Sequence, residues 1–155
     1  MSVSEGDKAP DFELEGEGGE THRLADYAGK KLVLYFYPRD DTPGCTKEAI
    51  AFTEHAGEFA AADTEILGVS KDTVAKHEKF RAKHGLGIKL GSDPEGEVIE
   101  RYGSWIEKKN YGRTYMGIDR STFLIDRDGK VARTWRKVRV KGHVEQVLEA
   151  TRDLG

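Results

Sequence analysis

The sequence predicts an α/β fold with a central mixed sheet flanked by helices. Apolar runs at 31–37 and 65–70 indicate strands buried on both faces, and an amphipathic segment follows each of them. Helices between buried strands are typical of parallel pairing, whereas turn residues at 16–19 and 127–130 predict antiparallel hairpins. We expect residues 1–155 to form one domain, because a chain of this length can bury a core.

Each element is justified by its local pattern. Residues 1–10 form a loose lead-in, and the alternation on both sides of 16–19 predicts an N-terminal β-hairpin over 11–24. Helix caps, prolines and turn residues then bound the later elements. These are a strand at 31–37, a helix at 44–62, a strand at 65–70, a helix capped by Asp72 or Ser70 and ending near His84, a strand at 88–90, a short helix opened by Pro94 and ending at Tyr102, a polar surface loop at 105–117, strands at 121–126 and 131–138, and a helix at 142–153.

The bulk properties exclude several classes of partner. The net charge of −3 gives no field that attracts nucleic acid or an anionic membrane. The apolar runs are far shorter than the ~20 residues that span a bilayer, so no membrane association is expected. Residues 1–10 lack the features of a secretion signal, and the one cysteine excludes an intramolecular disulfide. A cytoplasmic location is the expectation that fits both.

Two patterns suggest other sites but have simpler explanations. The turn at 126–129 resembles a calcium loop, yet lysines stand at 130 and 137, where such a loop needs oxygen ligands. The five histidines have neither a cysteine partner nor His-Glu-x-x-His spacing, so no metal site is expected.

A basic stripe near the C-terminal end protects an exposed edge strand more simply than it binds nucleic acid. The stripe consists of Arg133, Arg136, Lys137, Arg139 and Lys141.

Cys45 is the residue with the strongest chemical signal. It lies at the start of the helix predicted over 44–62, directly after Thr42-Pro43-Gly44. A lone cysteine is most often a small buried hydrophobic residue. A helix start, however, presents unpaired N–H groups and a partial positive charge, which stabilise a thiolate, and the thiolate is the nucleophilic form.

The helix start alone is not sufficient. Lowering the pKa of a cysteine from about 8.5 to about 6 takes about 3.4 kcal/mol, whereas a helix start supplies about 0.3–1 kcal/mol, and up to about 2 in good geometry. A nearby cation and hydrogen bonds to the sulfur must supply the remainder. A thiolate at Cys45 therefore requires an arginine from elsewhere in the chain.

The residues around Cys45 resemble a known family. Pro38-x3-Thr42-x2-Cys45 is similar to the active-site signature of the peroxiredoxins, and Tyr35-Phe36-Tyr37-Pro38 with Thr42-Pro43-Gly44-Cys45-Thr46 resembles their bacterioferritin comigratory protein (PrxQ) branch. The resemblance covers almost the whole chain. Further matching segments are 6–12, 66–72, 111–115, 117–126, 135–138 and 142–143.

The resemblance implies a thioredoxin-like fold and a thiol peroxidase with an antioxidant role, acting on hydrogen peroxide and small alkyl hydroperoxides without a cofactor. Cys45 is similar to the peroxidatic cysteine, which becomes a sulfenic acid. Thr42 resembles the threonine whose hydroxyl bonds the thiolate and the peroxide, and Pro38 the proline that shields the pocket. Arg120 matches the active-site arginine, the required cation. Glu48 resembles a residue that orients this arginine, and Gly44 completes the cysteine loop.

The sequence departs from the family at the resolving cysteine. Relatives place it five residues after the first cysteine or on the next helix, and here these positions hold Ile50 and Arg81. We therefore expect a one-cysteine cycle in which thioredoxin, glutaredoxin or glutathione reduces Cys45. A substitution at a native resolving position is the alternative. A monomer is expected, with a dimer left open.

Two rival functions remain. A thiol–disulfide oxidoreductase on the same fold is disfavoured, because Thr42 stands where a Cys-x-x-Cys pair needs its first cysteine. A non-enzymatic binding or chaperone-like module would retain the fold without consuming peroxide.

Overall fold

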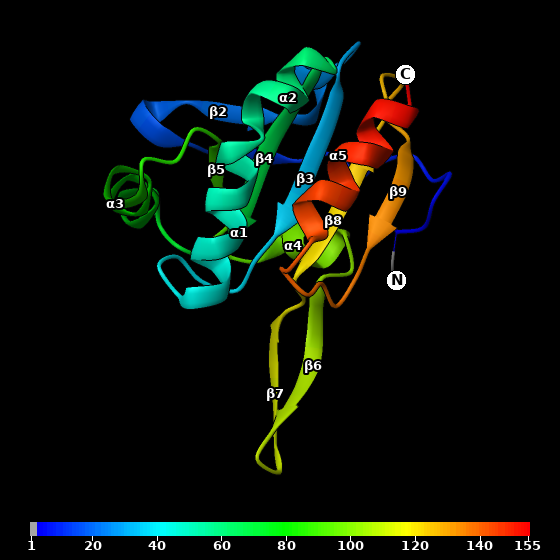
Figure 1. Cartoon of the computed structure of the whole chain (residues 1–155). Helices are drawn as coiled ribbons and strands as arrows, with labels where there is room; N and C mark the ends of the chain where they lie inside the picture. Colours follow the sequence, from blue (N-terminus) through cyan, green and yellow to red (C-terminus); the bar gives the residue numbers. More distant parts are fainter. Residues whose placement is uncertain (1–2) are drawn as a thin grey trace.

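The centre of the computed structural model is a mixed sheet whose strands lie in the order β2-β1-β5-β4-β3-β8-β9 (Figure 1). The structure describes residues 3–155, so the first two residues of the expected domain lie outside it. β3 pairs in parallel with β4 and antiparallel with β8. The strands are β1 (Glu13–Glu15), β2 (Thr21–Arg23), β3 (Lys31–Phe36), β4 (Thr64–Ser70), β5 (Lys89–Ser92), β8 (Ser121–Ile125) and β9 (Val131–Trp135).

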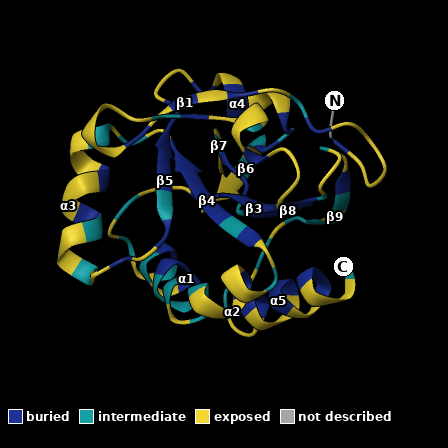
Figure 2. Ribbon diagram, turned by 90° about the horizontal axis from the view of Figure 1, so that it is seen from above, coloured by how far each residue is buried: buried dark blue, intermediate teal, exposed yellow. Residues whose placement is uncertain are grey.

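Helices flank this sheet, as Figure 2 shows from above. α1, α2 and α5 lie on one face, α4 lies on the other, and α3 lies beside β5. Two 3-10 turns, η1 (Glu17–Gly19) and η2 (Leu24–Tyr27), follow the first two strands. The α-helices are α1 (Pro43–Glu54), α2 (Ala56–Ala61), α3 (Val74–His84), α4 (Glu97–Arg101) and α5 (His143–Asp153). The predicted mixed sheet, its flanking helices and the N-terminal hairpin of β1 and β2 are confirmed.

β3 separates two hydrophobic cores. Its side chains alternate, so Leu34 and Phe36 face the core beneath α4, and Val33 and Tyr35 face the core beneath α1, α2 and α5. All six residues of the strand are buried, because helices cover both faces of the sheet. Cys45 belongs to the core on the α1 side, so the strand and this helix together fix the position of its sulfur.

The prediction of a surface loop over 105–117 is wrong. The segment forms a second, two-stranded sheet of β6 (Trp105–Asn110) and β7 (Arg113–Ile118), which projects from the body (Figure 1). The turn holds Tyr111 and Gly112 at φ 52° and 76°, the left-handed conformations that a tight two-residue hairpin needs. Most of its side chains are exposed on both faces, so no hydrophobic alternation marks the strands.

Several boundaries also differ from prediction. The helix predicted over 44–62 is interrupted at His55, which separates α1 from α2. α3 is capped by Thr73, whose hydroxyl accepts from Lys76 N at 3.2 Å, rather than by Asp72 or Ser70. The Asp72 carboxylate is otherwise engaged, because it accepts from the Ser70 hydroxyl at 2.7 Å.

The N-terminal ends of two other segments also differ. α4 begins at Glu97 after a left-handed Gly96, and Pro94 lies in the preceding turn. Residues 3–10 of the predicted loose lead-in are held against β9, since Gly6 N donates to Val131 O at 2.8 Å and Ala9 is buried. The lead-in thus covers part of the edge strand β9, along which the basic stripe begins.

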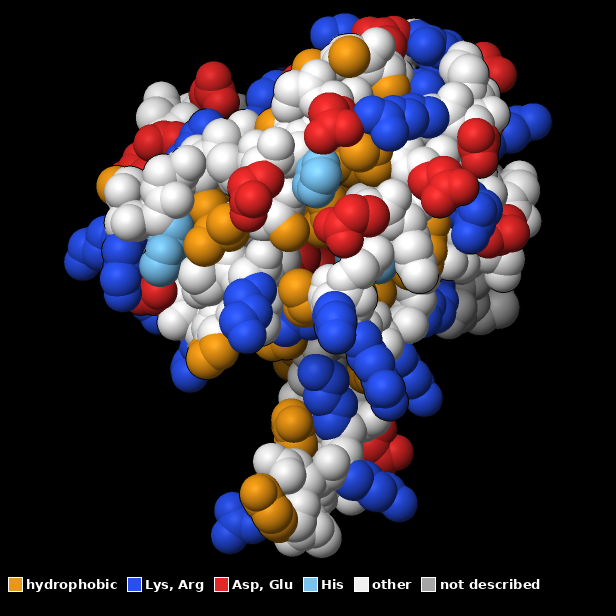
Figure 3. Space-filling model, in the orientation of Figure 1, with side chains coloured by type: hydrophobic (Ala, Val, Ile, Leu, Met, Phe, Trp, Pro, Cys, Tyr) orange, Lys and Arg blue, Asp and Glu red, His pale blue; other side chains and the backbone are white. Residues whose placement is uncertain are grey.

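Lys and Arg side chains gather where the β6–β7 hairpin leaves the body (Figure 3). Three large hydrophobic side chains on this hairpin are exposed, namely Tyr111, Tyr115 and Met116. Among residues 3–155, every helix is too short or too polar to cross a membrane.

Candidate active site

The first turn of α1 holds Cys45 at the junction with β3. Thr42 is the N-cap residue, Pro43 occupies the first helical position, and Thr46 N donates to Thr42 O at 2.8 Å. The helix thus begins one residue before the predicted start. Cys45 is only 2% exposed, so its sulfur is buried at the positive end of α1.

Arg120 joins Cys45 from the other end of the sequence. It lies between β7 and β8, and β8 is the antiparallel neighbour of β3. Its Nη2 donates to Cys45 Sγ at 3.3 Å, and its Nη1 donates to Glu48 Oε1 at 2.7 Å. One planar guanidinium therefore bridges the thiol and a carboxylate one turn further along α1. The structure thus brings together Cys45, Glu48 and Arg120, which the family resemblance assigned to one site.

Gly44 leaves room for this guanidinium. A side-chain carbon on Gly44 would stand 3.1 Å from Arg120 Nη2. That distance is shorter than most carbon–nitrogen contacts in proteins, so a side chain here would require the guanidinium to shift by a few tenths of an ångström. This contact explains sterically why position 44 holds a glycine, which the sequence alone does not explain.

Burial dominates the electrostatics of Glu48. Its side chain is fully buried, and this burial raises its pKa to about 7, although Arg120 acts in the opposite direction. Burial would lower the pKa of Arg120, but Glu48 and Cys45 together raise it, so the guanidinium stays charged. The second carboxylate oxygen of Glu48 has no hydrogen-bond partner within residues 3–155. The pair therefore keeps a cation at the sulfur, while Glu48 itself titrates near neutral pH.

The other predicted residues lie less directly at the sulfur. The Thr42 hydroxyl donates to Arg39 O at 2.9 Å, and the structure shows no hydrogen bond between Thr42 and Cys45 in the part of the chain it describes. The predicted bond from this hydroxyl to the sulfur is therefore not formed in this conformation. Pro38 is exposed at the end of β3, next to the buried Tyr37.

Neither candidate resolving position holds a side chain that could act as a thiol. Ile50 packs, partly buried, against the core on the α1 side. Arg81 on α3 pairs with Glu17 and donates to Leu86 O at 3.2 Å. Both residues have structural contacts of their own, and Cys45 is the only cysteine in the sequence.

Sequence reasoning missed two residues beside the site. The Tyr35 hydroxyl is buried without a hydrogen-bond partner among residues 3–155, and burial, with Glu48 and Cys45, raises its pKa far above the ordinary value. Burial and the nearby Arg120 lower the pKa of His143 to about 4. The alternation of β3 could have placed Tyr35 on the face toward α1, whereas no sequence signal places His143 near Arg120.

The comparisons with known proteins agree with this geometry. The sequence model of the AhpC/TSA family matches residues 5–134. The chain belongs to the AhpC/TSA family. It is 51% identical over 154 residues to Peroxiredoxin Bcp of Bacillus subtilis, covering 99% of this chain and 98% of the relative. It is 39% identical to Peroxiredoxin Bcp of Escherichia coli over 143 residues, covering 92% of each.

Solved structures support the same family and the thioredoxin-like fold. Peroxiredoxin Q of Xanthomonas campestris superimposes with a TM-score of 0.88 at 43% identity, covering 92% of this chain and 90% of that one. A PrxQ structure of Xylella fastidiosa gives a TM-score of 0.93 at 35% identity, covering 99% and 98%. This peroxiredoxin is thus an enzyme of the Bcp/PrxQ group, a thiol peroxidase whose reaction needs a peroxide and a thiol reductant.

Proposed function

We propose that Cys45 is the peroxidatic nucleophile and that this peroxiredoxin works with it alone. The observation that carries the proposal is the Arg120 guanidinium, which donates to the sulfur of the one cysteine at a helix start. A cation and a helix N-terminus both favour the thiolate over the thiol. Substrates are hydrogen peroxide and small alkyl hydroperoxides, because no charged group of the substrate is needed for this attack.

The chemistry proceeds by displacement at oxygen. The thiolate attacks one peroxide oxygen, an S–O bond forms as the O–O bond breaks, and water or an alcohol leaves after taking up a proton. Arg120 and the N–H groups at the start of α1 stabilise the charge that moves onto the departing oxygen. Cys45 is oxidised to a sulfenic acid and the peroxide is reduced. Thr42 completes the polar surroundings once its hydroxyl turns from Arg39 O toward the sulfur. Pro38, at the end of β3, shields the bound peroxide from solvent in this scheme.

Glu48 and Gly44 act through Arg120. The Glu48 carboxylate holds one guanidinium nitrogen, so the other points at the sulfur. Gly44 leaves the space that this approach requires. These are positioning roles, since neither residue contacts the peroxide directly in this scheme.

The reduction step uses external thiols. Ile50 and Arg81 stand at both candidate resolving positions, so a first external thiol attacks the sulfenic sulfur, releases water and forms a mixed disulfide. A second thiol then attacks this mixed disulfide, forms a disulfide with the first thiol and releases reduced Cys45. The reductant is thioredoxin, glutaredoxin or glutathione, and the enzyme works as a monomer in antioxidant defence in the cytoplasm.

One experiment tests the nucleophile and the cycle together. The reduced protein receives one equivalent of hydrogen peroxide, is divided among the three reductants, and is followed by mass spectrometry and by peroxide consumption. We expect a sulfenic acid on Cys45, turnover with at least one reductant, and no turnover in Cys45→Ser. Undiminished turnover in Cys45→Ser would refute the assignment, and a Cys45–Cys45 dimer as the main product would refute the one-cysteine cycle.

A further inference from the structure

The loop between β3 and α1 is attached to α3 by two successive aspartates. Asp40 Oδ2 lies 2.6 Å from His77 Nδ1, and both side chains are about 95% buried. Asp41 accepts from Lys83 Nζ at 2.7 Å and contacts His84 Nε2 at 2.8 Å. Asp41 adopts φ +60°, a conformation that costs energy for a residue other than glycine, so the loop is held in a strained shape.

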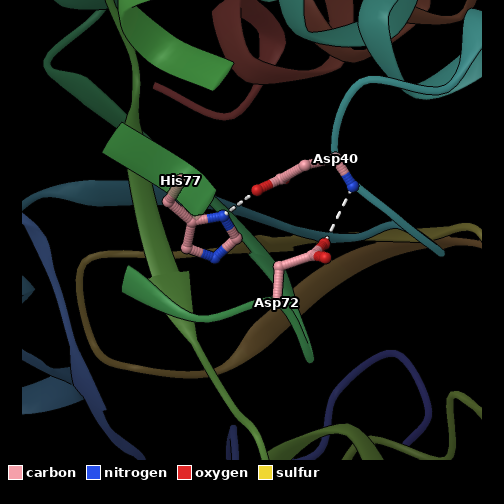
Figure 4. A group of neighbouring side chains, drawn as sticks. All are labelled: Asp40, Asp72 and His77. Carbon is pink, nitrogen blue, oxygen red and sulfur yellow. Dashed lines mark hydrogen bonds and ion pairs between the residues drawn. The ribbon is translucent and has the colours of Figure 1, made fainter. Parts of the chain in front are cut away.

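Figure 4 shows how the buried contact is built. The Asp40 carboxylate points at the His77 ring, and the Asp40 backbone N donates to Asp72 Oδ2 at 2.8 Å. The other oxygen of Asp40 accepts from the Tyr37 hydroxyl at 2.5 Å. Asp40 therefore joins the end of β3 to α3 and to the loop after β4.

The hydrogen-bond partners of His77 determine the roles of its two ring nitrogens. Nε2 lies 3.1 Å from Gly91 O, and a carbonyl oxygen only accepts, so Nε2 carries a hydrogen. Nδ1 faces a carboxylate oxygen, which requires a shared proton between them. Both sides of the ring are thus committed, one to β5 and one to the loop before Cys45.

Hydrogen bonds account fully for this cluster, although Asp40, Asp72 and His77 are residue types that bind metals. The 2.6 Å between Nδ1 and Oδ2 is too short for an ion between them, because each metal–ligand bond alone is about 2.0–2.2 Å. Asp72 Oδ2 already accepts from the Ser70 hydroxyl and from Asp40 N. The cluster is therefore a hydrogen-bonded anchor.

We propose that His77 is a positioning residue for peroxide reduction. By bonding Asp40, it fixes the loop between β3 and α1, which contains Thr42 and leads directly to the buried Cys45. Asp40 precedes Thr42, the N-cap residue of α1, by two positions, so a displaced Asp40 moves the N-cap and the first helical turn. Reactive groups misplaced by about 1 Å can lose about a hundredfold in rate. This inference rests on the proposed role of Cys45.

Two amide substitutions separate the two contacts of the ring. The amide nitrogen of asparagine lies as far from Cβ as Nδ1 does, so His77→Asn keeps a donor to Asp40. The amide nitrogen of glutamine corresponds to Nε2, so His77→Gln keeps the contact to Gly91 O and loses the one to Asp40. Asp40→Asn keeps a side chain that can hydrogen-bond Nδ1 of His77, whereas Asp40→Ala removes it.

The test is the stopped-flow rate of Cys45 oxidation by hydrogen peroxide, with folding checked by circular dichroism. His77→Gln and Asp40→Ala should slow it about ten- to a hundredfold, while His77→Asn and Asp40→Asn retain most of it. His22→Gln, at a buried histidine on β2, is the matched control and should leave the rate unchanged. If His77→Gln does not fold, Asp40→Ala on the loop carries the test.

Two results would overturn the inference: rates in folded His77→Gln and Asp40→Ala that equal that of the unsubstituted protein, or an equal loss in His77→Asn and His77→Gln. Failure of the proposed function looks different, because the unsubstituted protein would then not oxidise Cys45 with peroxide at all.

Discussion

Arg120 Nη2, which donates to Cys45 Sγ at 3.3 Å, lies only 3.1 Å from where a side-chain carbon on Gly44 would stand. The glycine is in helix α1, where alanine would be favoured by about 0.5–1 kcal/mol. The contact with Arg120 therefore favours glycine at position 44, whereas helix stability favours alanine. A substitution can measure the two effects separately.

Gly44→Ala should slow peroxide reduction several-fold without loss of stability, because the added carbon forces the guanidinium to shift by a few tenths of an ångström while the helix gains propensity. Gly57→Ala in α2 is the matched control, since nothing lies within 4 Å of the added carbon. The measurements are the rate of Cys45 oxidation and the melting temperature of each variant. Equal rates in both variants would remove the steric role of Gly44.

Glu48 should make the protein less stable as the pH rises. Burial raises its pKa from 4.5 to about 7, so between these values the folded protein keeps a proton that the unfolded chain loses. The free energy of unfolding then falls through this window, by a total on the order of 3 kcal/mol from this group. Urea titrations from pH 4.5 to 7.5 check this, and Glu48→Gln should remove the fall. An unchanged slope in Glu48→Gln would contradict it.

His143 should act in the opposite direction. Burial and Arg120 lower its pKa from 6.5 to about 4, so on acidification the unfolded chain takes up the proton first. The free energy of unfolding then drops as the pH falls from about 6.5 to about 4, again on the order of 3 kcal/mol from this group. His143→Gln preserves a group that can bond Thr122, which lies 2.8 Å from Nε2, and should resist acid better. Greater acid sensitivity in this variant would show that the assigned cause is wrong.

Tyr35 in β3 and Tyr37 directly after this strand allow a buried hydroxyl without a partner to be compared with one that has a partner. The Tyr35 hydroxyl is buried without a partner among residues 3–155, so Tyr35→Phe should be neutral or stabilising. The Tyr37 hydroxyl donates to the Asp40 carboxylate at 2.5 Å, so Tyr37→Phe should cost about 1.5–3 kcal/mol. Chemical denaturation of both variants measures the difference. Equal losses would mean that the Tyr35 hydroxyl has a partner of its own.

The sequence predicts the local elements that hold Cys45 better than it predicts which distant residues contact them. The run 31–37 and the residues Thr42 to Cys45 have local signals, namely a buried strand and a capped helix start, and both elements form there. A helix start stabilises a thiolate too little on its own, so a nearby cation is expected, but only the resemblance points to Arg120. Its approach depends on the pairing of β3 with β8, a long-range contact that no local pattern specifies.

The failures have physical causes as well. The hairpin at 105–118 projects from the body with most side chains exposed, so it lacks the hydrophobic alternation by which strands are recognised. The position of Asp72 before α3 suits a helix cap, but its carboxylate accepts a local hydrogen bond from Ser70 and a long-range one from Asp40 N instead. The Asp40–His77 anchor joins residues far apart in the sequence, and a lone histidine on a helix gives no sign of its partner.

The proposed stabilisation of a Cys45 thiolate by Arg120 can be measured by the ultraviolet absorbance of the thiolate. The signal at neutral pH that disappears on alkylation of Cys45 is compared between the unsubstituted protein and Arg120→Ala. We expect a large signal in the unsubstituted protein and the loss of most of it in Arg120→Ala. Equal signals in the two proteins, or none in the unsubstituted one, would contradict it.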